Sequence, residues 1–222
     1  MSKQDRYAIE TEEELVKFWD HQALHNELRR QRVTTRWANK NMSQYKFLWY
    51  MIRIAKPSSI LEIGCNMGGM FLLIKEVPHK YAIDVSPESI KMAQIEADKY
   101  NVDIHVSNAN KLKYKDKSFD MVYSMRTLSR VPYAMFEEVI SEVVRVLEDG
   151  GLFYYFEWEP YKFSDPRFDA RKQELMDTKS YEFLHDITYA LKNKGMVEIF
   201  GHLDGVGSEN RIKCWWKPHG EY

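Results

Sequence analysis

The sequence of 222 residues predicts an α/β fold with a doubly wound, mostly parallel sheet. Two patterns support this class: short apolar runs that suit buried strands, and longer stretches in which apolar residues recur at helical spacing. The first apolar run, Ser59–Ile63, ends in glycines, and a later one ends in Asp84, twenty residues after Gly64. Open α/β sheets bind ligands at the carboxyl ends of their strands, so we expect a nucleotide at these two strand ends.

Two helices are predicted before the first strand. Thr11 to Glu14 have the spacing of a capping box, and apolar residues follow at helical spacing up to Leu24. A second helical pattern runs from about Trp37 to Ala55 and is ended by Pro57. Both apolar faces must be buried, and one interpretation is that the two helices extend the core.

The glycines after the first strand indicate the kind of nucleotide. Gly64 permits a turn where a Cβ would clash, and Gly68 lets the backbone approach a ligand at the start of a helix predicted from Met67 to Lys75. A dinucleotide fingerprint requires G-x-G-x-x-G, but Asn66 occupies the place of the middle glycine, which disfavours a nicotinamide-dependent oxidoreductase. Asp84 stands where an acidic side chain accepts both hydroxyls of a ribose.

The pattern Glu62-x-Gly64-x-x-x-Gly68, followed by Asp84, resembles the class I S-adenosylmethionine-dependent methyltransferases of the small-molecule type. The first motif of that family is an acidic residue, one residue, glycine, three residues and glycine, and an acidic residue ends its second strand. The resemblance continues from Ser58 to the C-terminus. It implies a Rossmann-like, seven-stranded sheet whose last strand is antiparallel, and S-adenosyl-L-methionine as the cofactor.

The stretch after Asp84 continues the family pattern. Ser86 and Pro87 begin a capped helix, and the strand Val102–Val106 follows it. Asn108-Ala109 then stands where the family often carries Asp-Ala against the adenine ring. We expect the amide oxygen of Asn108 to accept a hydrogen bond from the adenine amino group.

The fourth strand and the turn after it match the family with one departure. Lys117–Ser124 resembles the family's fourth strand, and Leu128–Pro132 resembles its L-x-H-x-P turn. Arg130 replaces the histidine of that turn, so we expect no histidine base there, because arginine stays protonated. Arg126 and Arg130 are instead expected to bind a carboxylate or phosphate of the acceptor; solvated loop side chains are the alternative.

The remaining predicted elements complete the sheet. The first of them is an amphipathic helix that we expect Gly150 to end. In order they are a helix, a strand, a second helix and two strands: Val139–Leu147, Leu152–Phe156, Ser180–Lys194, Met196–Phe200 and Arg211–Trp216.

Two parts of the chain are expected. Residues 1–57 form an N-terminal helical extension, and residues 58–222 form the methyltransferase domain. In the resembled family, N-terminal helices commonly pack over the cofactor mouth and help to form the acceptor pocket. The resemblance therefore implies a lid as the second interpretation of residues 1–57.

The family's motifs carry over to this chain as a set of cofactor-binding candidates. They lie in the glycine turn and directly after the second, third and fourth strands. Cys65 is expected to be a small residue that fits the turn rather than a nucleophile. The candidates are Glu62, Gly64, Cys65, Asn66, Met67, Gly68, Asp84, Val85, Asn108, Ala109 and Met125.

Aromatic side chains and two carboxylates are concentrated from Phe153 to Phe163, at the carboxyl end of a predicted strand. Strand alternation puts Tyr155 and Glu157 on one face. An acidic group among aromatic rings suits a cationic or amine-bearing acceptor; the alternative is a buried strand with a solvated acidic end. We predict Arg130, Glu157 and Tyr155 as catalytic residues. The predicted substrate-binding residues are Trp19, Arg126, Arg130, Tyr155 and Glu157.

The histidines are better candidates for a general base than for metal ligands. His21 and His25 have the i, i+4 spacing of two zinc ligands, but Gln22 stands where such a helix carries its glutamate, and no third ligand is indicated. We therefore predict no metal. If the acceptor needs a base, the candidates are His21, His25 and His185, the last on the predicted late helix.

Methyl transfer from a sulfonium is an in-line displacement that depends on positioning more than on a dedicated base. We expect transfer to an oxygen or nitrogen of a small molecule. One alternative is an RNA or protein methyltransferase, for which the candidate surface is the basic cluster Arg29–Arg32 followed by Arg36 and Lys40. Another is a catalytically silent partner subunit that binds the cofactor, although the retained glycines and Asp84 argue against it.

The composition of the chain limits which binding partners and which cellular location we expect. The 32 basic and 33 acidic residues give a net charge of -1, so no global field favours nucleic acid or an anionic membrane. No apolar run is long enough to span a membrane, and the first residues lack a signal-peptide core. We therefore expect a cytoplasmic protein with a small-molecule acceptor, no membrane contact and no nucleic-acid partner. Two cysteines indicate no disulfide framework, and nothing indicates an oligomeric state.

Overall fold

The computed structural model describes residues 11–26, 43–158, 170, 173, 183–203 and 210–219. The predicted basic cluster at residues 29–32 and the aromatic residues after 158 lie outside this part of the chain. The described residues contain seven strands: β1 (Ser59–Ile63), β2 (His79–Asp84), β3 (Asp103–Val106), β4 (Phe119–Met125), β5 (Leu147–Trp158), β6 (Val197–Leu203) and β7 (Asn210–Trp216).

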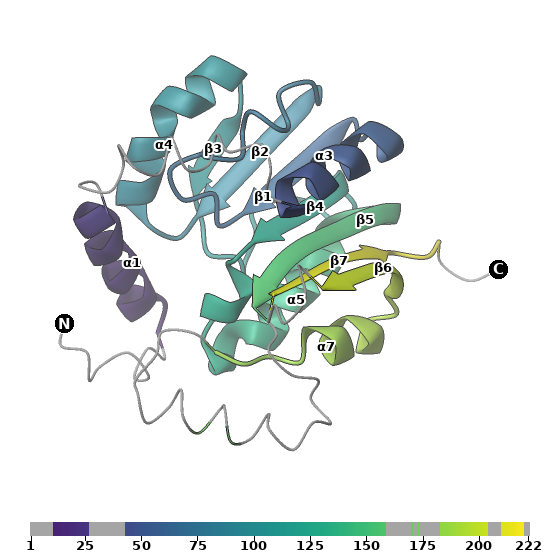
Figure 1. Ribbon diagram of the computed structural model, residues 1–222. Coiled ribbons are helices and arrows are strands. Elements are labelled where there is room, and N and C mark those ends of the chain that lie inside the picture. The colour runs from purple at the N-terminus through teal and green to yellow at the C-terminus, as the bar shows by residue number, and fades with distance from the viewer. Residues whose placement is uncertain are drawn as a thin grey trace.

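The seven strands form one sheet in the order β3-β2-β1-β4-β5-β7-β6 (Figure 1). Strands β1 to β5 pair in parallel, and β7 is antiparallel to both of its neighbours, β5 and β6. The predicted α/β class, the mostly parallel sheet and the antiparallel last strand are therefore confirmed.

Helices cover both faces of the sheet and its carboxyl edge. None of those in the described residues has a stretch long and apolar enough to cross a membrane. They are α1 (Glu12–Asn26), α3 (Ser43–Ala55), α4 (Pro87–Tyr100), the 3₁₀ turn η3 (Leu128–Arg130), α5 (Tyr133–Val146) and α7 (Ile187–Asn193).

Two predicted helix starts are confirmed by their side-chain caps. Thr11 Oγ1 accepts from Glu14 N (3.3 Å) while Glu14 Oε2 accepts from Thr11 N (3.1 Å), which is the reciprocal capping box of α1. Ser86 Oγ accepts from Ser89 N (3.1 Å) at the start of α4. Both caps satisfy amide groups that a helix start would otherwise leave unpaired.

The segment after the glycine turn departs from the prediction. We predicted a helix from Met67 to Lys75, but residues 66–76 form consecutive turns. Their backbone bonds span three residues, as from Phe71 N to Gly68 O (3.2 Å). Gly68 and Gly69 are poor helix formers, which favours separate turns over a continuous helix. This described segment therefore offers no helix N-terminus for an anion.

Two later helices have different bounds from those predicted. Helix α5 begins at Tyr133, before the predicted Val139, and its last residue, Val146, leads directly into β5. Gly150, which we expected to end this helix, lies inside β5 with φ at +87°. Helix α7 is shorter than predicted because it begins after Asp186, whose side chain caps it by accepting from the backbone N–H three residues later (2.8 Å).

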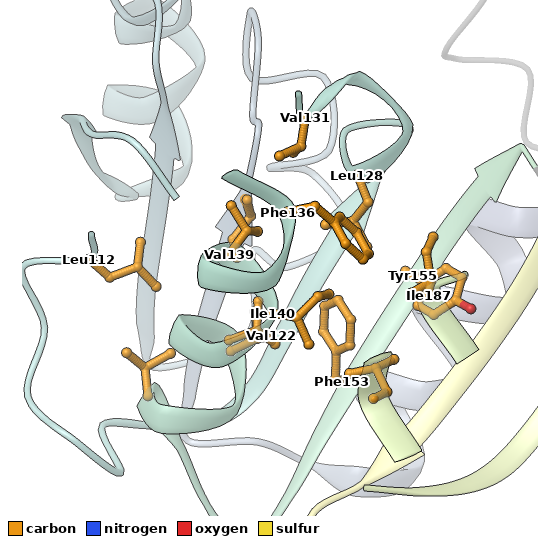
Figure 2. Packing of buried hydrophobic residues seen from close by; sticks show 14 of the residues in the cluster. Leu112, Val122, Leu128, Val131, Phe136, Val139, Ile140, Phe153, Tyr155 and Ile187 are labelled. Atoms are coloured by element: carbon orange, nitrogen blue, oxygen red, sulfur yellow. The ribbon is translucent and has the colours of Figure 1, made fainter. Parts of the chain in front are cut away.

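Apolar side chains form one cluster on each face of the sheet. The first joins the sheet to α5 and α7 and includes the fully buried Val122 and Ile140 (Figure 2). The second joins the opposite face to α3 and α4 and includes the fully buried Leu48. As predicted from alternation, Tyr155 lies in the first cluster and Tyr154 in the second. Helix α3 therefore extends the core.

Helix α1 has a different position, beside the edge toward which β4 and β5 point (Figure 1). Leu15 and Phe18 are buried in the first cluster, so the apolar face of α1 seals the core at this edge. Asp20 Oδ1 accepts from Ser86 Oγ (2.5 Å) and Glu88 N (3.2 Å) at the start of α4. These bonds attach α1 to the loop after β2. The boundary predicted at residue 57 stays a prediction.

Candidate functional site

The strand order reverses between β1 and β4, and open α/β sheets bind ligands in the crevice at such a point. Two non-glycine residues with left-handed backbone flank this point: Asn66 (φ 48°) after β1 and Arg126 (φ 62°) after β4. Asparagine adopts this conformation more readily than arginine does. Backbone strain concentrates at functional sites, so this geometry and the motif analysis indicate the same place.

The glycine turn is shaped by protein contacts. Gly64 N and Cys65 N both donate to Ile83 O (2.9 Å each), which binds the turn to the end of β2. Gly64 has φ at +78°, and a Cβ there would lie 2.1 Å from Thr127 Oγ1. We predicted that Gly68 admits a ligand, but a Cβ there would lie 2.7 Å from the Phe71 ring, and φ is +75°. Both glycines are thus required by the packing of the chain itself.

Asp84 is held at the end of β2 by two backbone amides. Its Oδ2 accepts from Asn66 N (2.9 Å) and its Oδ1 from Ser86 N (3.0 Å). Burial raises the pKa of this carboxyl, while the two hydrogen bonds oppose the rise. Each oxygen retains acceptor capacity, which fits two neighbouring hydroxyls of a ribose.

Glu62 lies inside the protein, on β1. Its side chain is 2% exposed, and its Oε2 accepts from the Tyr123 hydroxyl (2.8 Å). Burial raises the pKa of Glu62 to about 8, with Tyr123 lowering it and Asp84 adding to the rise. Tyr123 was not among the predicted site residues. A hydroxyl within the apolar fourth strand was the signal, because a buried tyrosine usually finds a polar partner.

Asn108 lies directly after β3, next to Ser107, whose N donates to Asp84 O (3.0 Å). We expected the Asn108 oxygen to accept from adenine, but it accepts from Asn110 N at 3.4 Å. The amide nitrogen is buried and has no partner among the described residues. A buried polar group without a partner is costly, and a purine ring offers several acceptor nitrogens. This orphaned donor therefore fits an adenine-containing cofactor.

The other cofactor candidates lie around these groups. Cys65 is 3% exposed, and burial raises the pKa of its thiol, which agrees with a small residue that fits the turn. The half-buried candidates are Met67, Val85, Ala109 and Met125. Cofactor contacts by these residues stay a prediction.

Tyr155 and Glu157 require a correction, because both are 0% exposed. Tyr155 packs in the first cluster, in which Figure 2 shows it together with Phe153 and Ile187. Glu157 accepts hydrogen bonds from the backbone amides of Thr127 to Ser129. With no exposed surface neither side chain can touch an acceptor, so the prediction that they are catalytic or substrate-binding is not carried further.

Three predicted acceptor residues lie together between α1 and the turn after β4. Arg130 Nε donates to Arg126 O (3.2 Å), and the Arg130 guanidinium carbon lies 5.7 Å from the centre of the Trp19 ring. Arg126 N donates to Phe156 O (2.8 Å) and so ties the turn to β5. The structure brings these three residues to one place, and their role in acceptor binding stays a prediction.

Of the three candidate bases, His185 is shown in contact with residues next to that turn. His185 precedes α7 instead of lying on a helix, its Nε2 is 2.7 Å from Val131 O, and its ring stacks on Phe136 (3.8 Å, 5°). Because a carbonyl only accepts, Nε2 must carry the hydrogen. His21 is exposed on α1, and the side chain of His25 lies outside the described residues. In the described ranges no group of three metal-binding side chains is present.

Comparison with known proteins identifies the family. A family profile described as a methyltransferase domain matches residues 61–155. That range begins in β1 and ends in β5, so it includes the glycine turn, Asp84 and Asn108. This match and the strand order identify residues 61–155 as a methyltransferase domain of the class I, S-adenosylmethionine-dependent type. The cofactor of this methyltransferase chain is accordingly S-adenosylmethionine.

Relatives of this methyltransferase chain have diverse names. A sterol 24-C-methyltransferase of Saccharomyces cerevisiae is 28% identical over 188 residues, which are 79% of this chain and 48% of that protein. An O-methyltransferase of Dictyostelium discoideum is 26% identical over 157 residues, 66% of this chain and 36% of that one. The chain spans about half the length of the first of these relatives and less of the second.

A solved structure shows the same fold. Magnesium protoporphyrin IX methyltransferase of Synechocystis, crystallised with S-adenosylhomocysteine, has a TM-score of 0.61. Its sequence is 13% identical, with 79% of this chain and 83% of that chain covered. At this identity the likeness concerns the fold alone.

Proposed function

We propose that this chain transfers the methyl group of S-adenosylmethionine to an oxygen or nitrogen of a small molecule that carries a carboxylate or phosphate. The observation that carries the proposal is the grouping of Arg126, Arg130 and Trp19 beside the switch point of the sheet. Arginine binds carboxylates and phosphates through a fork of N–H donors, and a neighbouring aromatic ring restricts its orientation. The cationic acceptor suggested by Glu157 loses its support, because that carboxylate is buried.

The cofactor, when bound, supplies the reactive methyl group through its sulfonium, and the protein supplies position. In this proposal Asp84 accepts from the ribose hydroxyls, and Asn108 pairs with the adenine ring. Glu62 binds the cationic amino group at the other end of the cofactor. Gly64 to Met67 and the residues after β2 to β4 provide backbone contacts between these ends.

An acceptor that arrives protonated needs a base, and we propose His185 for that role. Its Nε2–H bond to Val131 O and its stacking on Phe136 hold the ring beside the turn that carries Arg130. With the hydrogen on Nε2, Nδ1 is the nitrogen with a lone pair. A carboxylate acceptor would need no base, so loss of this histidine should affect hydroxyl and amine acceptors only.

Helix α1 is proposed as the lid over this site, and α3 as part of the core. The bonds of Asp20 to the loop after β2, and the contact of Trp19 with Arg130, support α1 in that role. We therefore propose the division into residues 1–57 and 58–222. Within the first part, α1 acts as the lid and α3 belongs to the core. A cytoplasmic location and the absence of nucleic-acid and membrane partners stay predictions from composition.

The test is a methyl-transfer assay of the purified chain with methyl-labelled S-adenosylmethionine and a panel of acceptors. The panel contains small hydroxy acids, phenols, amino acids and phosphate esters, each with an uncharged analogue, together with a sterol, RNA and a mixed protein fraction. We expect label in an acid or phosphate ester and not in its uncharged analogue. Replacing Arg130 by Met, which keeps length but not charge, should remove that preference.

Other outcomes would redirect the proposal. Relatives named as sterol 24-C-methyltransferases are the specific reason to include a carbon acceptor. Label in the sterol would show that the acceptor atom is carbon instead of oxygen or nitrogen. It would also remove the acceptor-binding role proposed for the arginines. Label in RNA or protein would favour the macromolecular alternative, and cofactor binding without transfer to any class would favour a silent subunit.

A further inference from the structure

The turn after β4 is held by a single buried carboxylate. Glu157 Oε1 accepts from Thr127 N (2.6 Å) and Leu128 N (2.7 Å), and Oε2 accepts from Ser129 N (3.2 Å). Three successive backbone amides thus point at one side chain that is 0% exposed. Backbone amides arranged in this way form a concave anion-binding nest, and here the anion belongs to the neighbouring strand β5.

The same turn packs directly on the glycine turn after β1. A Cβ on Gly64 would lie 2.1 Å from Thr127 Oγ1 and 2.5 Å from its Cγ2, so the Thr127 side chain fills the space that a larger residue would need. Gly64 is in turn bonded to Ile83 O, one residue before Asp84. A continuous series of contacts therefore runs from Glu157 through Thr127 to the turn expected to hold the cofactor.

We propose that Glu157 is a positioning residue of the cofactor site, which sets Thr127 against Gly64 by binding the amides of residues 127–129. This inference rests on the cofactor site of the proposed function. Its role is indirect, because a fully buried side chain touches neither cofactor nor acceptor. Loss of the carboxylate frees three amides and lets the turn move away from Gly64, which should loosen the cofactor site.

A matched control lies at the amino end of β4, the strand that leads into this turn. Asp120, near the start of β4, has an Oδ2 that accepts from Ser58 N (2.7 Å) and Ser59 N (2.9 Å). One carboxylate again binds successive amides next to a parallel strand, but at the amino end of the sheet, remote from the glycine turn. A variant at Asp120 therefore removes a similar structural contact without touching the proposed site.

The experiment compares Glu157→Gln with Asp120→Asn in the full chain. Melting temperature and the affinity for S-adenosylhomocysteine are measured for both, with calorimetric titration well below the lower melting temperature. Glutamine can still accept at one oxygen but places a donor opposite Ser129 N, so about one charged hydrogen bond is lost, equivalent to about a tenfold change. We expect Glu157→Gln to weaken binding by about tenfold and Asp120→Asn to leave it within about twofold, although both lower the melting temperature.

Equal affinities of wild type and Glu157→Gln would overturn the proposal, and so would equal losses in both variants, since those indicate a general loss of stability. If Glu157→Gln does not fold, Thr127→Gly decides, because it empties the space against Gly64 and leaves Glu157 in place. Unchanged affinity in Thr127→Gly would then overturn the positioning role. A wild-type chain that does not bind S-adenosylhomocysteine would instead refute the proposed function, and this inference with it.

Discussion

Glu62→Gln isolates the effect of a buried carboxylate beside the glycine turn. Burial raises the pKa of Glu62 from 4.5 to about 8, and the Tyr123 hydroxyl donates to it over 2.8 Å. Because the folded pKa is raised, the folded state holds this proton more tightly than the unfolded chain does. The stability that the protein gains by keeping Glu62 protonated is therefore fully present below pH 4.5, and it is lost as the pH rises through about 8.

The magnitude follows from the two pKa values. Between them, this group alone should lower the free energy of unfolding of the wild type by up to about 1.4 kcal/mol per pH unit. Glutamine does not titrate and still accepts from Tyr123. Glu62→Gln should thus match the wild type near about pH 5 and be the more stable protein near about pH 8.

The assay is urea unfolding of both proteins across this pH range, with Tyr123→Phe as the control that removes the donor and keeps the carboxylate. A stability difference between wild type and Glu62→Gln that does not change with pH would refute a titrating buried carboxylate. Above about pH 8, where the wild-type carboxyl is ionised, Glu62→Gln should also bind S-adenosylhomocysteine less well, because it lacks the charge that we propose pairs with the cofactor's amino group. A residue that costs stability and increases binding is typical of a functional site.

Four further changes test other contacts. Gly64→Ala should lower the free energy of unfolding by about 2–4 kcal/mol through its positive φ and the clash with Thr127, and adding Thr127→Gly should recover part of that loss in the same urea titration. Burial raises the pKa of Asp120, but its hydrogen bonds with Ser58 and Ser59 together outweigh burial and lower it. The wild type should therefore be more stable than Asp120→Asn above about pH 3.8, and this difference should shrink in urea unfolding curves as the pH falls. Asp84→Ala should weaken S-adenosylhomocysteine binding by about 1–3 kcal/mol in calorimetry, and unchanged binding would remove the ribose assignment. Asp20→Ala should release α1 from α4, which should appear as faster amide hydrogen exchange confined to α1. Faster exchange throughout the chain would contradict the role of Asp20 in attaching α1.

Local sequence signals predicted the central strands and the helix caps well. The bounds of β1, Ser59–Ile63, are those expected, because a short apolar run followed by glycine leaves little choice of register. The caps at Thr11 and Ser86 formed as predicted, since each depends on residues within one helical turn. The parallel order around β1 followed from the family motif, which covers the strands on both sides.

Features that depend on distant parts of the chain were missed. Alternation placed Glu157 on the correct face, but its burial depends on the β4 turn, about thirty residues earlier, presenting three amides. The attachment of Asp20 to Ser86 joins residues 66 positions apart, and no local pattern predicts it. The helix expected after Met67 failed for a local reason, because two adjacent glycines outweighed the helical spacing of apolar residues.

Calorimetric titration of the full chain with S-adenosylhomocysteine, with NADH as a parallel control, is the most direct test of the central claim that the carboxyl ends of β1, β2 and β4 form an S-adenosylmethionine site. We predict micromolar binding of S-adenosylhomocysteine and no binding of NADH, because Asn66 occupies the position where a dinucleotide site needs glycine. Binding of NADH alone, or of neither compound, would contradict that claim.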